Sequence, residues 1–270
     1  MTDKKNKILI LLDGTEDLEN SLNIAADTNI LNCDQIVLFF ILNPFNPITK
    51  GQETEVLYND FVHDNGRRLA SLYIEKLENI ILSKNLDIEV SHNVVNSYEN
   101  IIRRLALGDI DITVCSVKFS NKLDYIFNKS KNINYLVNIT KNILIIPYGF
   151  NYQSKYKNNF LVPYSDFSVN QEISFNGNLN SFNIDKITLI YESKSKVSVE
   201  NFIDESKEKK INLESLEIDS AFIENLSSLS DEFNLIFSRK LKKKFNFWEN
   251  FNKYSNYSLF SKKMPLFFHK

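Results

Sequence analysis

The chain has 270 residues, of which 43% are hydrophobic and 13% aromatic, a composition that supports packed cores and differs from that of disordered proteins. Its 32 Lys and Arg residues nearly balance 34 Asp and Glu residues, so the net charge of −2 gives no general reason to expect nucleic acid or a membrane surface as a partner. The longest purely apolar run, 36–42, is far shorter than the roughly 20 residues of a membrane span. The first apolar run is also too short for a signal peptide. We therefore expect a cytoplasmic protein.

The first half of the chain is predicted to alternate strands with helices. Residues 7–12 are apolar on both faces, which is typical of a strand buried from both sides. A turn at 13–15 then leads into an amphipathic helix. Such alternation requires a parallel sheet that is covered on both faces. Further strands are predicted at 36–42, 88–95, 112–116 and 143–147, with a helix at about 55–84 and a shorter one that Ser97 caps and Gly108 ends.

The same order of segments starts again after a polar stretch. Residues 160–168 repeat the opening of residues 8–15, an apolar strand followed by Asp. Counterparts of the other strands follow at 187–193, 213–219, 233–240 and 264–268. We therefore predict a first domain over 1–150, a linker over 151–158, and a second domain over 159–270 that is shortened and degenerate.

Three segments, 7–26, 111–120 and 138–147, resemble the universal stress protein family in its tandem form. The first matches the family's apolar strand that ends in Asp and a small residue, and the last matches its short apolar strand that ends in Pro. The spacing from Ser130 to Pro147 also equals the family's spacing from a small hydroxyl residue to that proline. The resemblance implies an α/β fold with two doubly wound parallel-sheet domains in tandem, of the flavodoxin-like or adenine nucleotide hydrolase-like kind.

The resemblance also implies how the domains pair. Family members tend to associate through the fifth strand, and tandem members can pair two domains within one chain. The corresponding segments here are 143–147 and 264–268, which would form either a homodimer or an intramolecular pseudo-dimer. Pairing of this kind covers an apolar edge strand that would otherwise promote aggregation.

Nucleotide-binding members of the family hold adenosine with an Asp after the first strand and phosphates with a G-x2-G-x9-G-[ST] loop after the fourth. The three glycine positions fall on Ser116, Phe119 and Lys129, and glycine is what lets a backbone adopt positive φ and approach a phosphate. We therefore expect this loop to be lost and no cofactor to be bound, with ATP or AMP as the disfavoured alternative. The candidate pocket consists of Asp13, Gly14, Thr15, Ser116, Lys129 and Ser130. Asp13 has a structural alternative, in which it only positions the first helix.

Catalytic and metal-binding patterns are lacking. His63, His92 and His269 are isolated, and the sequence has neither a GxSxG elbow nor a Walker-type GxxxxGK[ST] loop. The cysteines Cys33 and Cys115 lack CxxC spacing and indicate buried thiols. The basic run 239–244 is interpreted as a solvated loop rather than a nucleic-acid site. We expect no enzyme, no metal, and neither nucleic acid nor a membrane as partner.

These observations favour a non-catalytic stress-response protein that acts through association with an unidentified protein partner. The alternative is a weak adenine-nucleotide-binding protein that uses its N-terminal domain. An enzyme of the wider adenine nucleotide hydrolase-like fold would need a glycine-rich loop after the first strand, and the segment DGTEDLEN does not supply one.

Overall fold

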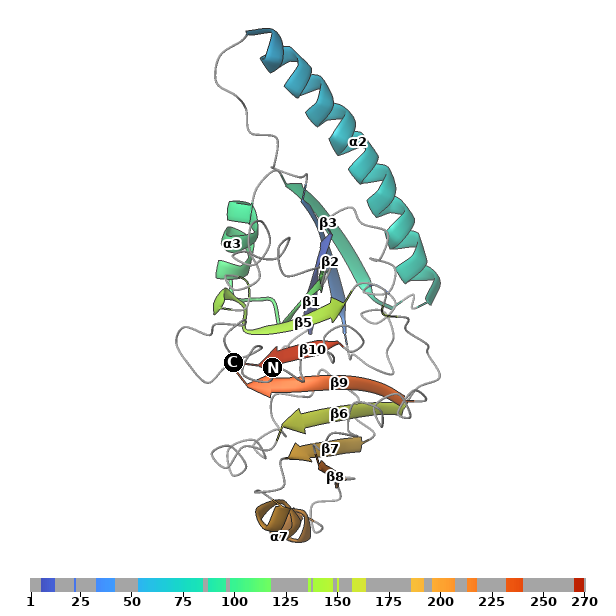
Figure 1. Cartoon of the computed structure of the whole chain (residues 1–270). Coiled ribbons are helices and arrows are strands. Elements are labelled where there is room, and N and C mark those ends of the chain that lie inside the picture. The colour runs from blue at the N-terminus through green and yellow to red at the C-terminus, as the bar shows by residue number, and fades with distance from the viewer. Residues whose placement is uncertain are drawn as a thin grey trace.

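In the computed structural model of the chain, the strands and helices that can be described lie in both halves of the sequence (Figure 1). The described residues are 6–12, 22, 33–41, 53–84, 87–95, 98–117, 136, 138–147, 150, 157–163, 186–191, 196–206, 213–217, 232–239 and 265–269. Of the helices, three have their bounds within these residues: α2 (Glu53–Lys84), α3 (Tyr98–Ala106) and α7 (Lys196–Ser206).

Ten strands among the described residues form one sheet. In the first half they are β1 (Lys7–Leu12), β2 (Gln35–Ile41), β3 (Glu89–Val95), β4 (Ile112–Val117) and β5 (Asn142–Pro147). In the second half they are β6 (Lys157–Pro163), β7 (Lys186–Tyr191), β8 (Leu213–Glu217), β9 (Glu232–Arg239) and β10 (Leu266–His269).

The order across the sheet is β3-β2-β1-β4-β5-β10-β9-β6-β7-β8. All neighbours within the first five strands are parallel, and so are all neighbours within the last five. Read outward from the middle, each half places its strands in the same sequence order. The two halves join where β5 and β10 pair antiparallel, with Ile145 opposite Leu266 and Ile143 opposite Phe268.

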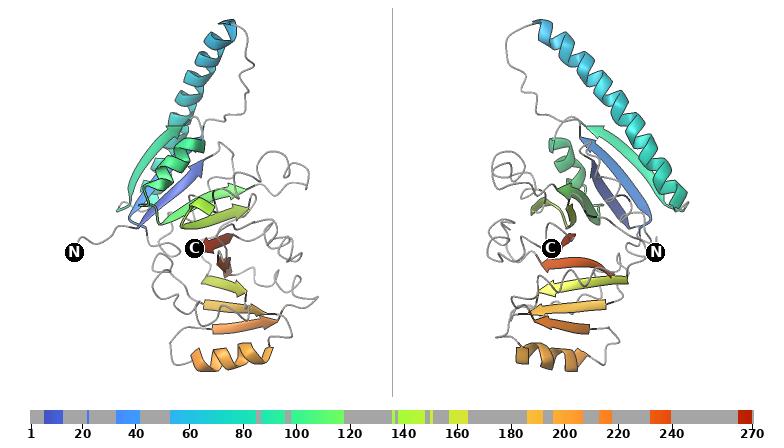
Figure 2. Two further views of the ribbon diagram at one scale, coloured as in Figure 1. Left: turned by 90° about the vertical axis from the view of Figure 1, so that its left-hand side faces the viewer. Right: turned by 45° about the vertical axis from the view of Figure 1, so that its right-hand side comes forward.

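The strands of the first half are apolar on both faces because both faces are covered. Ile8, Ile10 and Leu12 belong to a core that also contains Ile74 and Leu77 of α2. The alternate residues of β1 point to the other face, on the side of α3, and Leu9 is fully buried there. Figures 1 and 2 show α2 and α3 on opposite sides of the sheet. The doubly wound arrangement therefore explains the continuous apolar runs of the sequence.

Helix α2 packs on the sheet through its C-terminal half. Ala70, Ile74, Leu77 and Ile81 are all buried, and they recur at intervals of three or four residues. On β3, an edge strand, His92 contacts Glu78 of the helix, with Nδ1 2.6 Å from Oε1. The N-terminal half of α2 extends past the end of the sheet (Figure 2).

Helix α3 ends as the sequence predicts. Gly108 follows the helix with φ of 71°, a left-handed conformation that glycine adopts without a Cβ penalty. Its N–H donates to the carbonyl of Leu105 at 3.1 Å, which closes the last turn. The chain can therefore reverse directly into β4.

The prediction of an α/β protein with a doubly wound parallel sheet is confirmed. One boundary is corrected: β6 begins at Lys157, so the last two residues of the expected linker 151–158 are part of a strand, where they pair with β9. The assignment of 1–150 and 159–270 to separate domains stays a prediction. None of the described helices is long and apolar enough to cross a membrane.

Candidate functional site

The order of the strands places the carboxyl ends of β1 and β4 side by side. Leu11 and Cys115 are register partners, so the chain leaves β1 next to the end of β4. In an open α/β sheet, the chain segments that leave two such neighbouring strands run to opposite faces of the sheet. A crevice that can hold a ligand forms between them. The nucleotide pocket expected from the sequence would lie here.

Of the predicted pocket residues, Ser116 is the one that the structure describes. It is half-buried and lies in β4, where it is the register partner of Ile146 on β5. The other five, Asp13, Gly14, Thr15, Lys129 and Ser130, lie outside the described residues. The pocket therefore stays a prediction whose one described member sits at the expected edge of the sheet.

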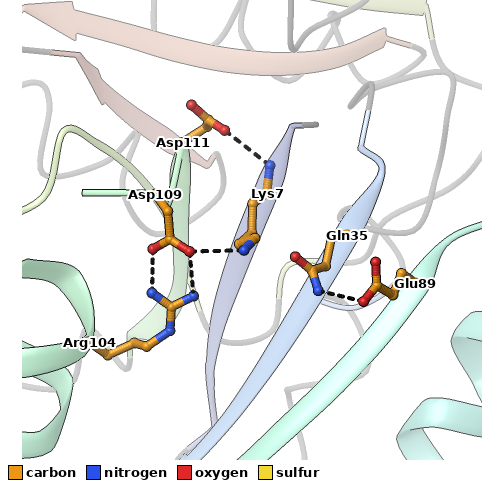
Figure 3. Close-up of polar contacts among 6 residues, drawn as sticks. All are labelled: Lys7, Gln35, Glu89, Arg104, Asp109 and Asp111. Atoms are coloured by element: carbon orange, nitrogen blue, oxygen red, sulfur yellow. Dashed lines mark hydrogen bonds and ion pairs between the residues drawn. The ribbon is translucent and has the colours of Figure 1, made fainter. Parts of the chain in front are cut away.

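Polar side chains gather instead at the opposite edge, where the strands begin. Asp109, between α3 and β4, accepts hydrogen bonds from Lys7 Nζ at 2.9 Å and from Arg104 Nη2 at 3.0 Å (Figure 3). Arg104 Nη1 contacts the other carboxylate oxygen of Asp109, which makes the arginine pair bidentate. One carboxylate thus connects the last turn of α3 to the start of β1.

The next acidic residue along the chain joins β1 to β4 and β5. Asp111 is 8% exposed, and its Oδ2 accepts a hydrogen bond from the Lys7 backbone N–H at 3.1 Å. Its own N–H donates to the Lys7 carbonyl at 2.9 Å, and its carbonyl accepts from Asn142 Nδ2 at 2.8 Å. The amino ends of three neighbouring strands are therefore fixed to one another.

The charged side chains of this network are those of Lys7, Arg104, Asp109 and Asp111, and we call them the ion cluster. The hydrogen-bonded Arg104 guanidinium holds the pKa of Asp109 well below its usual range, against the opposing effect of burial, and the Lys7 ammonium lowers the pKa further. Two cationic and two acidic side chains balance in charge. A carboxylate that is ionised and already paired does not take up a proton near neutral pH, so Asp109 is unsuited to general acid or base catalysis.

Two more contacts continue the polar edge across β2 and β3. Gln35 Nε2 donates to Glu89 Oε1 at 3.0 Å, and Asp34 Oδ2 accepts from the Asn6 N–H at 2.6 Å (Figure 3 shows the first). Nearby, the Cys33 thiol is buried and lies 3.2 Å from the Gln35 carbonyl oxygen. Burial raises the pKa of Cys33 to about 12. This thiol is therefore neutral and a poor nucleophile.

The network that Lys7 and Arg104 form with Asp109 and Asp111 was not predicted from the sequence. A usable signal was present: Lys7 and the two aspartates stand directly before the apolar runs of β1 and β4. In a parallel sheet such positions meet at one edge. What the sequence does not show is which of them become partners.

The prediction of buried thiols is confirmed, since Cys33 and Cys115 are both free and buried. Among the residues that the structure describes, no group of three His, Cys, Asp or Glu side chains could share a metal ion. The described polar residues thus form a structural network at the amino edge of the sheet.

The sequence matches no protein-family model and no curated protein. Its structure is similar to that of a universal stress protein from Archaeoglobus fulgidus, with a TM-score of 0.66, 13% identity, and coverage of 98% of this chain and 96% of that one. The cytoplasmic domain of a prokaryotic cation chloride cotransporter is also similar, with a TM-score of 0.52, 8% identity, and coverage of 98% and 95%. A functionally unknown protein from Pseudomonas aeruginosa gives 0.50 at 12% identity, with coverage of 98% and 92%. The chain therefore has the fold of universal stress proteins, as its sequence predicted.

Proposed function

We propose that this protein is a non-catalytic cytoplasmic member of the universal stress type, which acts through protein association and has lost the phosphate-binding loop. The observation that carries the proposal is the absence of glycine from residues 109–148, the segment that includes β4 and β5. In this fold the segment after the fourth strand is where a phosphate would be held. Without glycine, backbone N–H groups cannot close around an anion in the usual way.

The fold does not require nucleotide chemistry. Fold and function are separable, and function depends on the site. The polar groups described at the amino edge are paired and balanced in charge, so this edge supplies neither a nucleophile nor a base.

Weak adenine-nucleotide binding by the N-terminal half is the second candidate. The register of β1 and β4 favours it, because Leu11 and Cys115 are partners and the positions of Asp13 and Ser116 follow closely. An Asp and hydroxyl residues at that edge could hold an adenosine without a phosphate nest. This candidate predicts AMP binding that is not strengthened by further phosphates.

Isothermal titration calorimetry with ATP and AMP separates the two candidates. We expect no heat of binding at millimolar ligand for the wild-type protein, and no nucleotide in the purified sample by mass spectrometry. Stoichiometric copurified ATP would overturn the proposal. Binding of AMP that disappears in Asp13→Ala would instead establish the second candidate.

A gain-of-function variant supplies the matched control. Replacing Ser116, Phe119 and Lys129 together by glycine restores the G-x2-G-x9-G-S pattern that ends at Ser130. If the missing glycines are the cause of lost binding, this triple variant binds ATP while the wild-type chain does not. Its folding is checked by circular dichroism before titration.

A further inference from the structure

We draw no further inference here: the strongest candidate, the exposed face of helix α2 that carries Leu69 and Leu72 beside the open groove of about 480 Å³ along the same helix, is an apolar surface patch, and nothing among the described residues shows what covers it.

Discussion

Phe267 on β10 lies opposite Leu144 on β5, at the antiparallel junction of the two five-stranded halves. Phe267 is 1% exposed and Leu144 is fully buried, and both belong to the core that includes Tyr191 and Val199 of the second half. β10 has only four residues, and in the sheet it is the strand that joins the second half to β5. The junction therefore depends on few residues.

Replacing Phe267 by Ala is expected to lower the free energy of unfolding by about 3–5 kcal/mol, because it leaves a cavity in the core at the junction. Urea denaturation followed by circular dichroism measures the change. The control Leu107→Ala alters an exposed leucine and is expected to change the free energy by less than about 0.5 kcal/mol. Equal effects of the two variants would contradict the packing of Phe267.

Removing the charge of Asp109 is expected to weaken the amino edge. The Asp109 side chain is 40% exposed, so solvent screening limits the cost of Asp109→Asn to about 1 kcal/mol in the free energy of unfolding. The loss is expected to shrink at high salt. A variant as stable as the wild-type chain at low salt would show that the ion cluster contributes nothing.

The same carboxylate predicts a pH dependence. The folded-state pKa of Asp109 lies below its ordinary value of 3.8, so the stabilisation is fully present above that value and is lost as pH falls toward the folded-state pKa. Denaturation curves recorded from neutral to strongly acidic pH should show a steeper loss for the wild-type chain than for Asp109→Asn. Parallel losses in the two proteins would contradict the assigned shift.

Glycine is expected to be required at position 108 because of its positive φ, and not because a larger side chain would clash with neighbouring atoms. An added Cβ at this position meets nothing within 4 Å, but φ is positive, so Gly108→Ala should cost about 1 kcal/mol in the free energy of unfolding. Gly108→Asn should cost less, since Asn tolerates left-handed backbone better than Ala does. Thermal denaturation of both variants measures the difference, and the reverse order would refute the explanation.

Thr113 carries a buried hydroxyl whose Oγ1 has no hydrogen-bond partner among the described residues. It is 1% exposed on β4, with Leu9 and Ile143 as its register partners on the neighbouring strands. Thr113→Val keeps the side-chain shape and removes the unpaired polar atom, so it should raise the free energy of unfolding by about 1 kcal/mol. A loss of stability on urea denaturation would indicate a partner for the hydroxyl.

Much of the fold was predictable from the sequence. Strands buried on both faces carry continuous apolar runs, and β1, β4 and β5 were predicted within one or two residues of their observed bounds for that reason. Gly108 marked the end of α3 because few other residues adopt its backbone conformation. The predicted pocket can be compared with the structure at one residue, because Ser116 alone among its members lies in the described part of the chain.

By itself, the sequence determined the type and order of the strands and helices, and it showed that the segment from 109 to 148 has no glycine. These properties are local, because they follow from residue type and from periodicity along a few turns or one strand. The tertiary structure alone decided that Lys7 meets Asp109 across 102 positions of sequence, and that α2 carries exposed leucines. Such contacts depend on which strands become neighbours, and the apolar periodicity within one strand does not specify its neighbours.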